Sequence, residues 1–445
     1  MNDPWWLVLI KVVVLFVVLL VWTIFNVWYE RRLVGKMQHR LGPILNGPFG
    51  LAQAVGDAMK LLIKEDFMPA RVDRVLFTIA PIVAGTAAFT AWAVMPFGGE
   101  VEIFGVTTRL QLAELDIGVL VFLAVSSVAI YGFVLAGWSS SSSYALLGAL
   151  RSSAQMISYE IAMGLSLVAV FLYAGSMSTS EIVEAQRLPL QPFGIDAWGM
   201  PNWLFVTLIP SFLIYVISMV GETNRAPFDL PEAESELVSG YLTDYSGFRY
   251  AAFFLAEYIN MATVSGIATT LFLGGYLPFW PLNNIEFLNN PWLGPVWFAV
   301  KVQLFISLFV WLRGTLPRFR YDQFMKLGWK GLIPISLGWL VLISVIRKAQ
   351  QEGMSDAIWY GTIGTAVVLL LVMVVLLFVG DKEPQPEPAL DEPFDAFAGG
   401  YPVPPMPGQV LPELSDIVSL VAEPGDESGP PPEPAQPADR RISEP

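Results

Sequence analysis

Carboxylates in and beside apolar stretches carry the first chemical signal in this sequence. Six of them lie between Glu222 and Asp244, in a turn that joins two apolar stretches. Glu257 follows inside the next apolar stretch with no cationic residue near it in sequence, and Glu160 is embedded in another, nine residues after Arg151. That separation is about 13 Å along a helix axis, too far for a direct ion pair. An ionisable group costs roughly 2.5–3.5 kcal/mol at the centre of a membrane helix. The pattern therefore favours a proton or ion path through these carboxylates over a packing role.

The acidic turn also predicts the start of a helix. Asp229 is a suitable N-cap, Pro231 falls in the first turn, and Glu232 completes a capping box. Glu232 and Glu236 would then lie one turn apart on one face, with no Lys or Arg between them. Two like charges in that arrangement make one of the pair hold a proton more readily. The structural alternative is that these acids only stabilise the helix N-terminus.

The first polar loop predicts an amphipathic helix beside the membrane. Its sequence, FGLAQAVGDAMKLLIKED, places Val55, Met59 and Leu62 on one face. The other face carries polar and charged side chains: Gln53, Asp57, Lys60 and Lys64. Such a helix can lie along the bilayer with its charges in water, or its polar face can line a cavity. The spacing alone leaves both interpretations open.

Two lysines also fall within apolar stretches. Lys11 is close enough to the Trp5-Trp6 pair to extend its ammonium toward the membrane surface. Lys301 lies near the middle of its stretch, so we expect it to have an acidic partner in another helix.

Nine apolar stretches of about 20 residues predict an all-α integral membrane protein. Hydrophobic residues make up 54% of the chain, above the level of an ordinary soluble domain. The first stretch is too long for a signal-peptide core and has no small-residue cleavage site, so we expect it to stay as an anchor. The predicted spans are Trp5–Trp28, Val75–Met95, Ile117–Gly137, Ser152–Ala174, Trp203–Gly221, Tyr250–Tyr276, Trp292–Leu312, Trp329–Ile346 and Ala357–Gly380.

Lys and Arg in the connecting loops predict the orientation of these spans. The first loop carries eight of them from Arg31 to Arg74, and the seventh carries five from Arg313 to Lys330. Both loops therefore belong in the cytoplasm. Nine spans then place the N-terminus outside, the C-terminus in the cytoplasm and the acidic turn on the cytoplasmic side.

The composition changes abruptly at Lys382, where Pro, Glu, Asp and Ala become dominant. Such a segment cannot bury enough apolar area to offset the entropy of ordering. We therefore predict a membrane domain over residues 1–381 and a Pro-rich, acidic, disordered tail over residues 382–445. Within the tail, Gln409–Val421 has apolar residues at nearly helical spacing. That segment is either a docking helix or a chance pattern.

The chain has no cysteine, and His39 is its single histidine. This composition excludes iron–sulfur clusters held by this chain and argues against haem, zinc or other metal sites. The sequence also lacks a Gly-rich phosphate loop between a strand and a helix. Any redox cofactor must therefore be held by a partner.

Several long motifs resemble the family of the H subunit of bacterial NADH-quinone oxidoreductase, the respiratory complex I. They are ERRLVGKMQHRLGP, FGLAQAVGDAMKLLIKED, GWSSSSSYALLGALRSSAQMISYEIA, GETNRAPFDLPEAESELVSGY, FFLAEY and LRGTLPRFRYDQFMKLGWK. The resemblance covers about Trp5–Ile346 in the same order, and the tail lies outside it. Two loops depart from the family pattern, at Ser139–Ser143 and at Ile44.

The resemblance implies that this chain joins the electron-transfer arm of the complex to its proton-pumping membrane arm in the bacterial inner membrane. Quinone would be the substrate, and NADH, FMN and iron–sulfur clusters would bind to partner subunits. The quinone chamber would include Arg31, Gln38, Arg40, Asp57, Lys60, Arg225, Phe228, Asp229, Glu232, Glu234, Glu236 and Arg249. The acidic proton path would include Glu30, Glu160, Glu222 and Glu257.

Two other functions fit parts of the sequence. The membrane anchor of an energy-converting hydrogenase shares a segment like PFDLPEAE, but the longer context GETNRAPFDL and the loop PRFRYDQ favour the quinone enzyme. A stand-alone secondary transporter would show inverted repeats around a site at mid-membrane. The sequence shows no convincing repeat, and its charges gather on one side.

Overall fold

The computed structural model confirms an all-α membrane protein and describes residues 3–188, 201–229, 237–351 and 364. Within these residues, seven helices are long and apolar enough to cross a membrane. The predicted ninth span, apart from Gly364, and the boundary at residue 382 and the tail lie outside the described residues. The described helices are α1 (Trp5–Met37), α2 (Ala52–Ile63), α3 (Arg74–Thr90), α4 (Gly118–Ser139), α5 (Ser143–Ala174), α6 (Thr179–Arg187), α7 (Leu204–Thr207), α8 (Ile209–Glu222), α10 (Gly247–Phe272), α11 (Gly294–Thr315), α12 (Tyr321–Lys326) and α13 (Ile333–Gln351).

The predicted fifth span is divided into two helices. The chain bends at Leu208, which has φ −118° and ψ 47°, and the short helix α7 ends there. Pro210 stands in the first turn of α8. Backbone N–H groups in the first turn have no partner within the helix, so the N–H that proline lacks is not missed there. Helix α8 has 14 residues, so it is shorter than the seven described helices that are long enough to cross a membrane.

Shorter turns of helix connect the long ones. A π-helical turn (Leu327–Leu332) joins α12 to α13. The 3₁₀ turns are Pro48–Gly50, Ala91–Val94, Gly240–Leu242, Leu282–Asn284, Glu286–Asn289 and Pro291–Leu293.

A small β-hairpin interrupts the loop between α3 and α4. Strand β1 (Glu100–Ile103) pairs antiparallel with β2 (Val106–Arg109), and Ile103 stands opposite Val106. The two turn residues, Phe104 and Gly105, both have positive φ, as the favoured tight hairpin turn requires. The sequence predicts only helices for the membrane body, because a search for long apolar stretches passes over strands of four residues.

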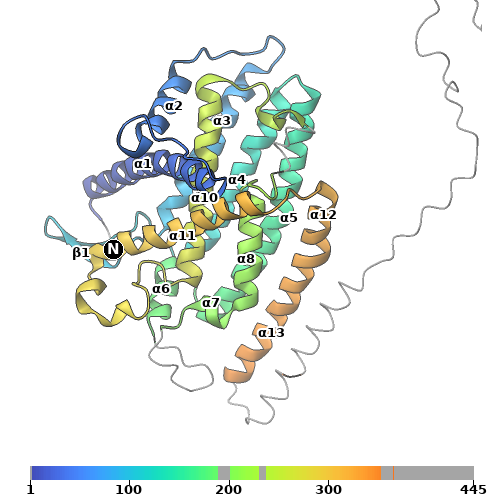
Figure 1. Ribbon diagram of the computed structural model, residues 1–445. Helices are drawn as coiled ribbons and strands as arrows, with labels where there is room; N and C mark the ends of the chain where they lie inside the picture. The colour runs from blue at the N-terminus through green and yellow to red at the C-terminus, as the bar shows by residue number, and fades with distance from the viewer. Residues whose placement is uncertain (1–2, 189–200, 230–236, 352–363, 365–445) are drawn as a thin grey trace, which may run out of the picture. The chain divides into compact units, whose positions relative to one another are not determined.

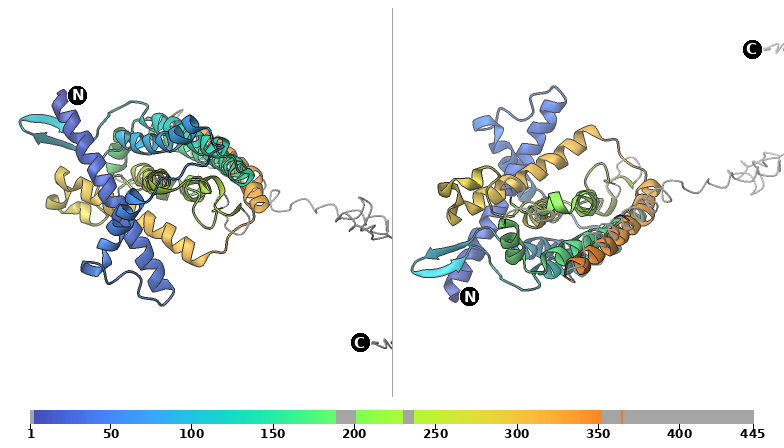
Figure 2. Two further views of the ribbon diagram at one scale, coloured as in Figure 1. Left: turned by 90° about the horizontal axis from the view of Figure 1, so that it is seen from above. Right: turned by 90° about the horizontal axis from the view of Figure 1, so that it is seen from below.

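The long helices pack as a curved row beside a buried central helix. Helix α3 packs on α4, α4 on α5, and α5 on both α8 and α13. Figure 2 shows the row from α3 to α13, coloured from blue to orange, with α1 at the far end of the body. Helix α10 is the most central of the described membrane helices. In its most apolar stretch 67% of the residues are buried, compared with 17% in α1. It contacts α3, α8 and α11 (Figure 1).

Small residues allow the row to pack closely, as in many membrane helix pairs. A Cβ added to Gly132 on α4 would lie 2.8 Å from Ala84 Cβ on α3. A Cβ added to Gly148 on α5 would lie 2.6 Å from the Cα of Gly240. Neither position can take a larger side chain without moving a neighbouring backbone.

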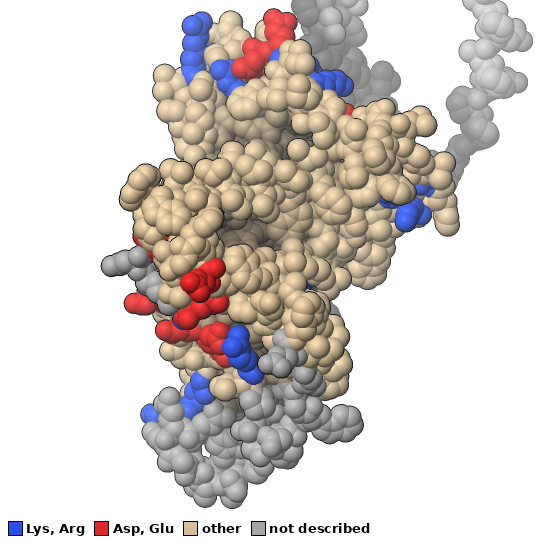
Figure 3. Space-filling model, turned by 90° about the vertical axis from the view of Figure 1, so that its left-hand side faces the viewer, with Lys and Arg blue, Asp and Glu red and all other residues tan. Residues whose placement is uncertain are grey.

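The surface agrees with a membrane location. Figure 3 shows charged side chains gathered at the top of one face and in a patch lower down, with most of the surface between them uncharged. Helix α1 contributes many exposed apolar residues, among them Val13 (53%) and Val17 (51%). Such exposure is expected where lipid replaces water as the solvent.

The two intramembrane lysines find partners of different kinds. Lys11 donates to Asp3 Oδ2 at 2.6 Å and to Thr108 Oγ1 at 2.7 Å, so its ammonium is held by protein as it extends toward the N-terminus. The prediction of an acidic partner for Lys301 is wrong within the described residues. Its ammonium donates to the carbonyl oxygens of Leu273 (2.5 Å), Gly275 (3.0 Å) and Leu277 (2.7 Å). The physical reason is that the segment following α10 turns several of its carbonyl groups toward one point, and a cation there can satisfy them.

Candidate functional site

A buried cluster of charges joins three separate parts of the chain. Glu30 comes from α1, Arg225 from the loop after α8, and Glu257 from α10. Arg225 Nε lies 2.9 Å from Glu257 Oε1, and Arg225 Nη1 lies 3.4 Å from Glu30 Oε1. The three side chains are only 11% (Arg225), 7% (Glu30) and 14% (Glu257) exposed. One guanidinium therefore bridges two carboxylates away from water.

Glu30 has further partners from two more positions. Tyr258 Oη donates to Glu30 Oε2 at 2.5 Å, and Arg313 at the end of α11 forms an ion pair with Glu30 Oε1. The centre of the Arg225 guanidinium also lies 4.4 Å from the centroid of the Tyr258 ring, in cation–π contact. Buried ion pairs contribute little net stability, because the cost of desolvation offsets the attraction. Their presence here points to a function.

The turn that holds Arg225 is fixed by its own backbone and by α5. Asn224 adopts φ 51°, the left-handed conformation that asparagine tolerates better than most residues. The backbone N–H of Phe228 then donates to the carbonyl of Arg225 at 2.8 Å. Gln155 on α5 donates to the carbonyls of Gly221 at 2.8 Å and Phe228 at 2.9 Å. These bonds set the position of Arg225 between the two carboxylates.

Asp229 lies at the edge of this cluster. Its Oδ2 accepts from Arg318 Nη2 at 2.9 Å, while Oδ1 has no hydrogen-bond partner among the described residues. Burial raises the pKa of Asp229 above its ordinary value, although Arg318, Arg225 and Arg313 oppose that shift. For Arg225, burial alone would lower the pKa, but Glu257 and Glu30 raise it well above its ordinary value. The guanidinium therefore stays charged.

Aromatic side chains close the other side of the turn. The Phe228 ring lies 4.5 Å from that of Phe324 and 5.5 Å from that of Phe319. Tyr159 stacks on Phe324 at 4.2 Å and donates to its carbonyl at 3.0 Å. The result is an apolar wall beside a charged cluster.

Glu160 and Glu222 form a second acidic position. Glu222 is 3% exposed, and its Oε2 has no hydrogen-bond partner among the described residues. Glu160 accepts hydrogen bonds from Ser126 at 3.2 Å and from Ser127, both on α4. The two carboxylates are close enough to interact electrostatically. Among the described residues, Glu160 therefore has two hydroxyl partners.

The first-loop residues lie at the surface near the end of α1. Arg31 forms an ion pair with Asp57, which also accepts from Gln53 at 3.1 Å. Arg40 Nε donates to Gln38 at 2.8 Å, and Lys60 is exposed. Val55, Met59 and Leu62 on α2 are 48%, 50% and 55% exposed. The predicted amphipathic helix is confirmed, and its apolar face is left uncovered by the described part of the chain.

Arg249 is part of a different contact. It forms an ion pair with Asp66 at 3.1 Å and lies over the Phe77 ring at 5.5 Å. It stands eight residues before Glu257 on α10, about 12 Å along the helix axis. The structure therefore does not join it directly to the Arg225 cluster. Glu232, Glu234, Glu236 and the helix predicted to start at Asp229 lie outside the described residues.

Three residues of the cluster were not predicted as site residues. Tyr258 follows Glu257 directly, and a polar side chain next to an intramembrane carboxylate was a usable signal. Arg313 and Arg318 were counted only as loop charges, and nothing in their spacing links them to Glu30 or Asp229. Within the described residues, no group of His, Asp or Glu is arranged to hold a metal ion. The arrangement is suited to moving protons and shifting charge.

Comparison with known proteins identifies relatives over most of the chain. A family model described as NADH dehydrogenase matches residues 10–344. The NADH-quinone oxidoreductase H subunit of Cutibacterium acnes is 56% identical over 417 residues, which cover 93% of this chain and 94% of that protein. The proteins of the same name from Streptomyces avermitilis and Frankia alni are each 52% identical. Their alignments cover 93% and 84% of this chain and 90% and 80% of the respective proteins.

The pairwise alignments reach further along the chain than the family model does. The alignment with the Cutibacterium acnes protein covers 93% of the 445 residues, which is more than the first 381 residues can supply. It therefore extends past Lys382. The family model itself ends at residue 344, within the predicted membrane domain. With a family model and relatives that agree over the membrane body, the chain belongs to the H-subunit family of NADH-quinone oxidoreductase, whose members are membrane subunits of respiratory complex I.

Proposed function

We propose that this chain forms part of the quinone chamber of a proton-translocating NADH-quinone oxidoreductase and begins the acidic path that couples quinone reduction to proton pumping. The observation that carries this proposal is the buried bridge from Glu30 through Arg225 to Glu257. It joins the charged end of α1 to α10, the most buried of the described membrane helices.

The bridge can couple charge to proton affinity. Two unit charges 4 Å apart interact by about 4 kcal/mol at an effective dielectric constant of about 20. Arg225 stabilises both Glu30 and Glu257 in their charged forms, so any negative charge that draws it away from one carboxylate raises the proton affinity of that carboxylate. Reduction of a quinone near this turn would supply such a charge. Glu257 would then take up a proton.

Glu222 and Glu160 would continue the path. Gln155, five residues before Glu160 on α5, donates to the carbonyl of Gly221, one residue before Glu222. Like charges that interact cannot both ionise freely, so a proton that arrives at one carboxylate can be passed to the other. Ser126 and Ser127 can donate to Glu160 in either protonation state.

The chamber residues come from the family resemblance. We propose that they lie on the cytoplasmic side of the membrane body and that quinone reaches them from the bilayer. They are Arg31, Gln38, Arg40, Asp57, Lys60, Arg225, Phe228, Asp229, Glu232, Glu234, Glu236 and Arg249. The apolar wall around Phe228 suits a hydrophobic ring, and Arg225 and Asp229 supply polar groups beside it. NADH, FMN and iron–sulfur clusters would be held by partner subunits, in agreement with the absence of cysteine from this chain.

The chain is a multi-pass membrane protein, and the proposal extends to the membrane it occupies and to its orientation. We place the protein in the bacterial inner membrane with the N-terminus outside and the C-terminus in the cytoplasm. The Lys and Arg content of the first and seventh loops supports this orientation.

The proposal is tested by replacing Arg225 with Gln in the assembled complex. Electron transfer from NADH to ferricyanide should be unchanged, because that route does not use this chain. Electron transfer to quinone and the pH gradient in inverted vesicles should both fall by at least about tenfold, the factor that corresponds to about 1.4 kcal/mol. The matched control is Arg187→Gln, since Arg187 is 59% exposed and far from the cluster in sequence. Normal quinone activity in the Arg225→Gln complex would contradict the proposal.

A further inference from the structure

An apolar groove lies at the opposite end of α1 from the charged cluster. It has a volume of about 210 Å³ and lies between α1, the end of β2 and the start of α11. Its walls include Val14, Leu15, Val18, Phe97, Leu110 and Pro295. On α1, Lys11 at the rim of the groove precedes Glu30 by 19 residues, about 28 Å along the helix axis. The groove therefore plays no part in the proposed quinone chemistry.

The groove opens toward lipid. Val14 and Val18 are 55% and 50% exposed on a helix that crosses the membrane. Two exposed aromatic residues mark the nearby membrane surface, Trp5 at 79% and Phe104 at 84%. Lys11 follows Trp5 by six residues, which places it about 9 Å along α1 from that tryptophan. An acyl chain that lies in the groove would thus run from the membrane surface into the hydrocarbon layer.

A polar cavity continues the groove at its outer end. It has a volume of about 320 Å³, and it shares Gln111 and Leu112 with the groove. Asp3, Thr108, Arg109 and Glu114 also line it. Lys11, which lines the groove, donates to Asp3 Oδ2 at 2.6 Å. An apolar slot thus ends in a chamber that offers both positive and negative groups.

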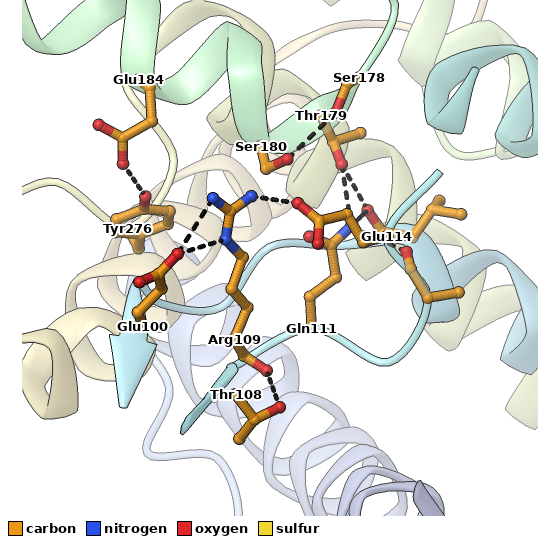
Figure 4. Close-up of polar contacts among 12 residues, drawn as sticks. Glu100, Thr108, Arg109, Gln111, Glu114, Ser178, Thr179, Ser180, Glu184 and Tyr276 are labelled. Carbon is orange, nitrogen blue, oxygen red and sulfur yellow. Dashed lines mark hydrogen bonds and ion pairs between the residues drawn. The ribbon is translucent and has the colours of Figure 1, made fainter. Parts of the chain in front are cut away.

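The charges in this cavity are well defined. Burial alone would raise the pKa of Asp3, but hydrogen bonds from Lys11 and Thr108 hold it below its ordinary value. Arg109 forms ion pairs with Glu114 and, at 3.3 Å, with Glu100 (Figure 4). These two carboxylates raise the pKa of Arg109, although burial opposes the shift. Carboxylates and cations therefore stand side by side around the same space.

We propose that the groove and the polar cavity together bind one zwitterionic phospholipid of the ethanolamine type. One acyl chain lies along Val14 and Val18. The phosphate faces Arg109, and the primary ammonium donates hydrogen bonds to Asp3 and Glu114. A headgroup with only negative charge would leave these carboxylates facing an anion, and a choline headgroup has no N–H to donate.

The test uses the intact purified complex and a phosphatidylethanolamine with a photoreactive diazirine in its acyl chain. After illumination, cross-linked peptides are located by mass spectrometry. Val18→Trp fills the groove and should reduce labelling of α1 near Lys11 by about tenfold. Val17→Trp is the matched control, because Val17 is 51% exposed on the same helix but does not line the groove. It should leave the labelling unchanged.

The headgroup is tested by competition and by substitution. Unlabelled phosphatidylethanolamine should displace the probe at lower concentration than phosphatidylcholine or phosphatidylglycerol, and Glu114→Gln should remove that preference. Equal labelling in the Val18→Trp and Val17→Trp complexes would overturn the proposal. Equal competition by all three lipids would overturn it too. Absence of labelling at α1 in the assembled complex would also overturn it and indicate that a neighbouring subunit covers the groove.

Discussion

The Nε atom of Arg225 lies 2.9 Å from the Oε1 atom of Glu257, although the two residues are 32 positions apart and belong to different elements. Glu257 lies in α10, the most buried of the described membrane helices, and Arg225 stands in the turn that follows α8. The same guanidinium reaches Glu30 on α1. A change of charge at the turn therefore acts directly on the carboxylates of Glu30 and Glu257.

The close contact between α3 and α4 predicts that Gly132→Ala destabilises the protein. The added Cβ would lie 2.8 Å from Ala84 Cβ and 2.9 Å from the Ala84 backbone nitrogen, so a helix backbone has to move. Overpacking of this kind costs about 1–3 kcal/mol. Thermal unfolding of the solubilised complex should show a lower midpoint. Gly164→Ala is the control, because nothing lies within 4 Å of its added Cβ. A midpoint no lower for Gly132→Ala than for Gly164→Ala would refute the packing argument.

Replacement of Glu160 by Gln separates proton transfer from packing. The variant keeps the Oε1 acceptor for Ser126 and Ser127 but loses the titratable proton. We expect an assembled complex with normal NADH–ferricyanide activity and a severely reduced pH-gradient dye signal in inverted vesicles. Glu181→Gln, at an exposed position on α6, serves as the control. Normal pumping by the Glu160→Gln complex would eliminate this carboxylate as an essential proton carrier, whereas loss of both signals would indicate failed assembly.

Asp229 predicts a particular dependence of stability on pH. Because burial raises its pKa in the folded protein above the ordinary 3.8, the folded state holds this proton more tightly than the unfolded state. The resulting stabilisation is complete below the unfolded pKa and is lost as pH rises through the folded pKa. Asp229→Asn should remove this contribution. Thermal unfolding from about pH 4 to 7 should then show wild type losing stability relative to the variant as pH rises. A constant difference between the two proteins would show that the proposed titration is absent.

Truncation after Lys382 should leave quinone reduction largely intact. The segment that follows is rich in Pro and acidic residues and low in apolar residues, so it is not expected to contribute to a packed chamber. The measurement is NADH–quinone turnover by the fully assembled truncated enzyme, with subunit content checked by mass spectrometry. Loss of turnover at normal subunit content would make the tail part of the catalytic unit.

The sequence predicted the membrane class and the main acidic residues because these depend on local composition. An apolar run of about 20 residues implies a span wherever it packs, and a carboxylate within it stands out at once. The partners of those carboxylates were not predictable. The sequence identifies Arg225 as a loop residue. Its contact with Glu257, however, depends on the left-handed turn at Asn224 and on the hydrogen bonds from Gln155.

Other failures have the same origin in tertiary structure. The sequence suggests an acidic partner for Lys301, but the carbonyl groups of the segment after α10 satisfy its ammonium. The hairpin turn at Phe104 and Gly105 was missed, because strands of four residues leave no long hydrophobic pattern. The break at Leu208 could have been foreseen from Pro210, because proline favours the first turn of a helix over its interior.

The most direct test of the coupling claim is the infrared difference spectrum of the assembled complex before and after quinone reduction. If reduction changes the charge near Arg225, Glu257 must change its protonation, and the spectrum should contain a protonated-carboxyl band. That band should vanish in the Glu257→Gln complex and persist in the Glu181→Gln complex. A carboxyl band that survives unchanged in Glu257→Gln, or a wild-type spectrum without one, would contradict the account.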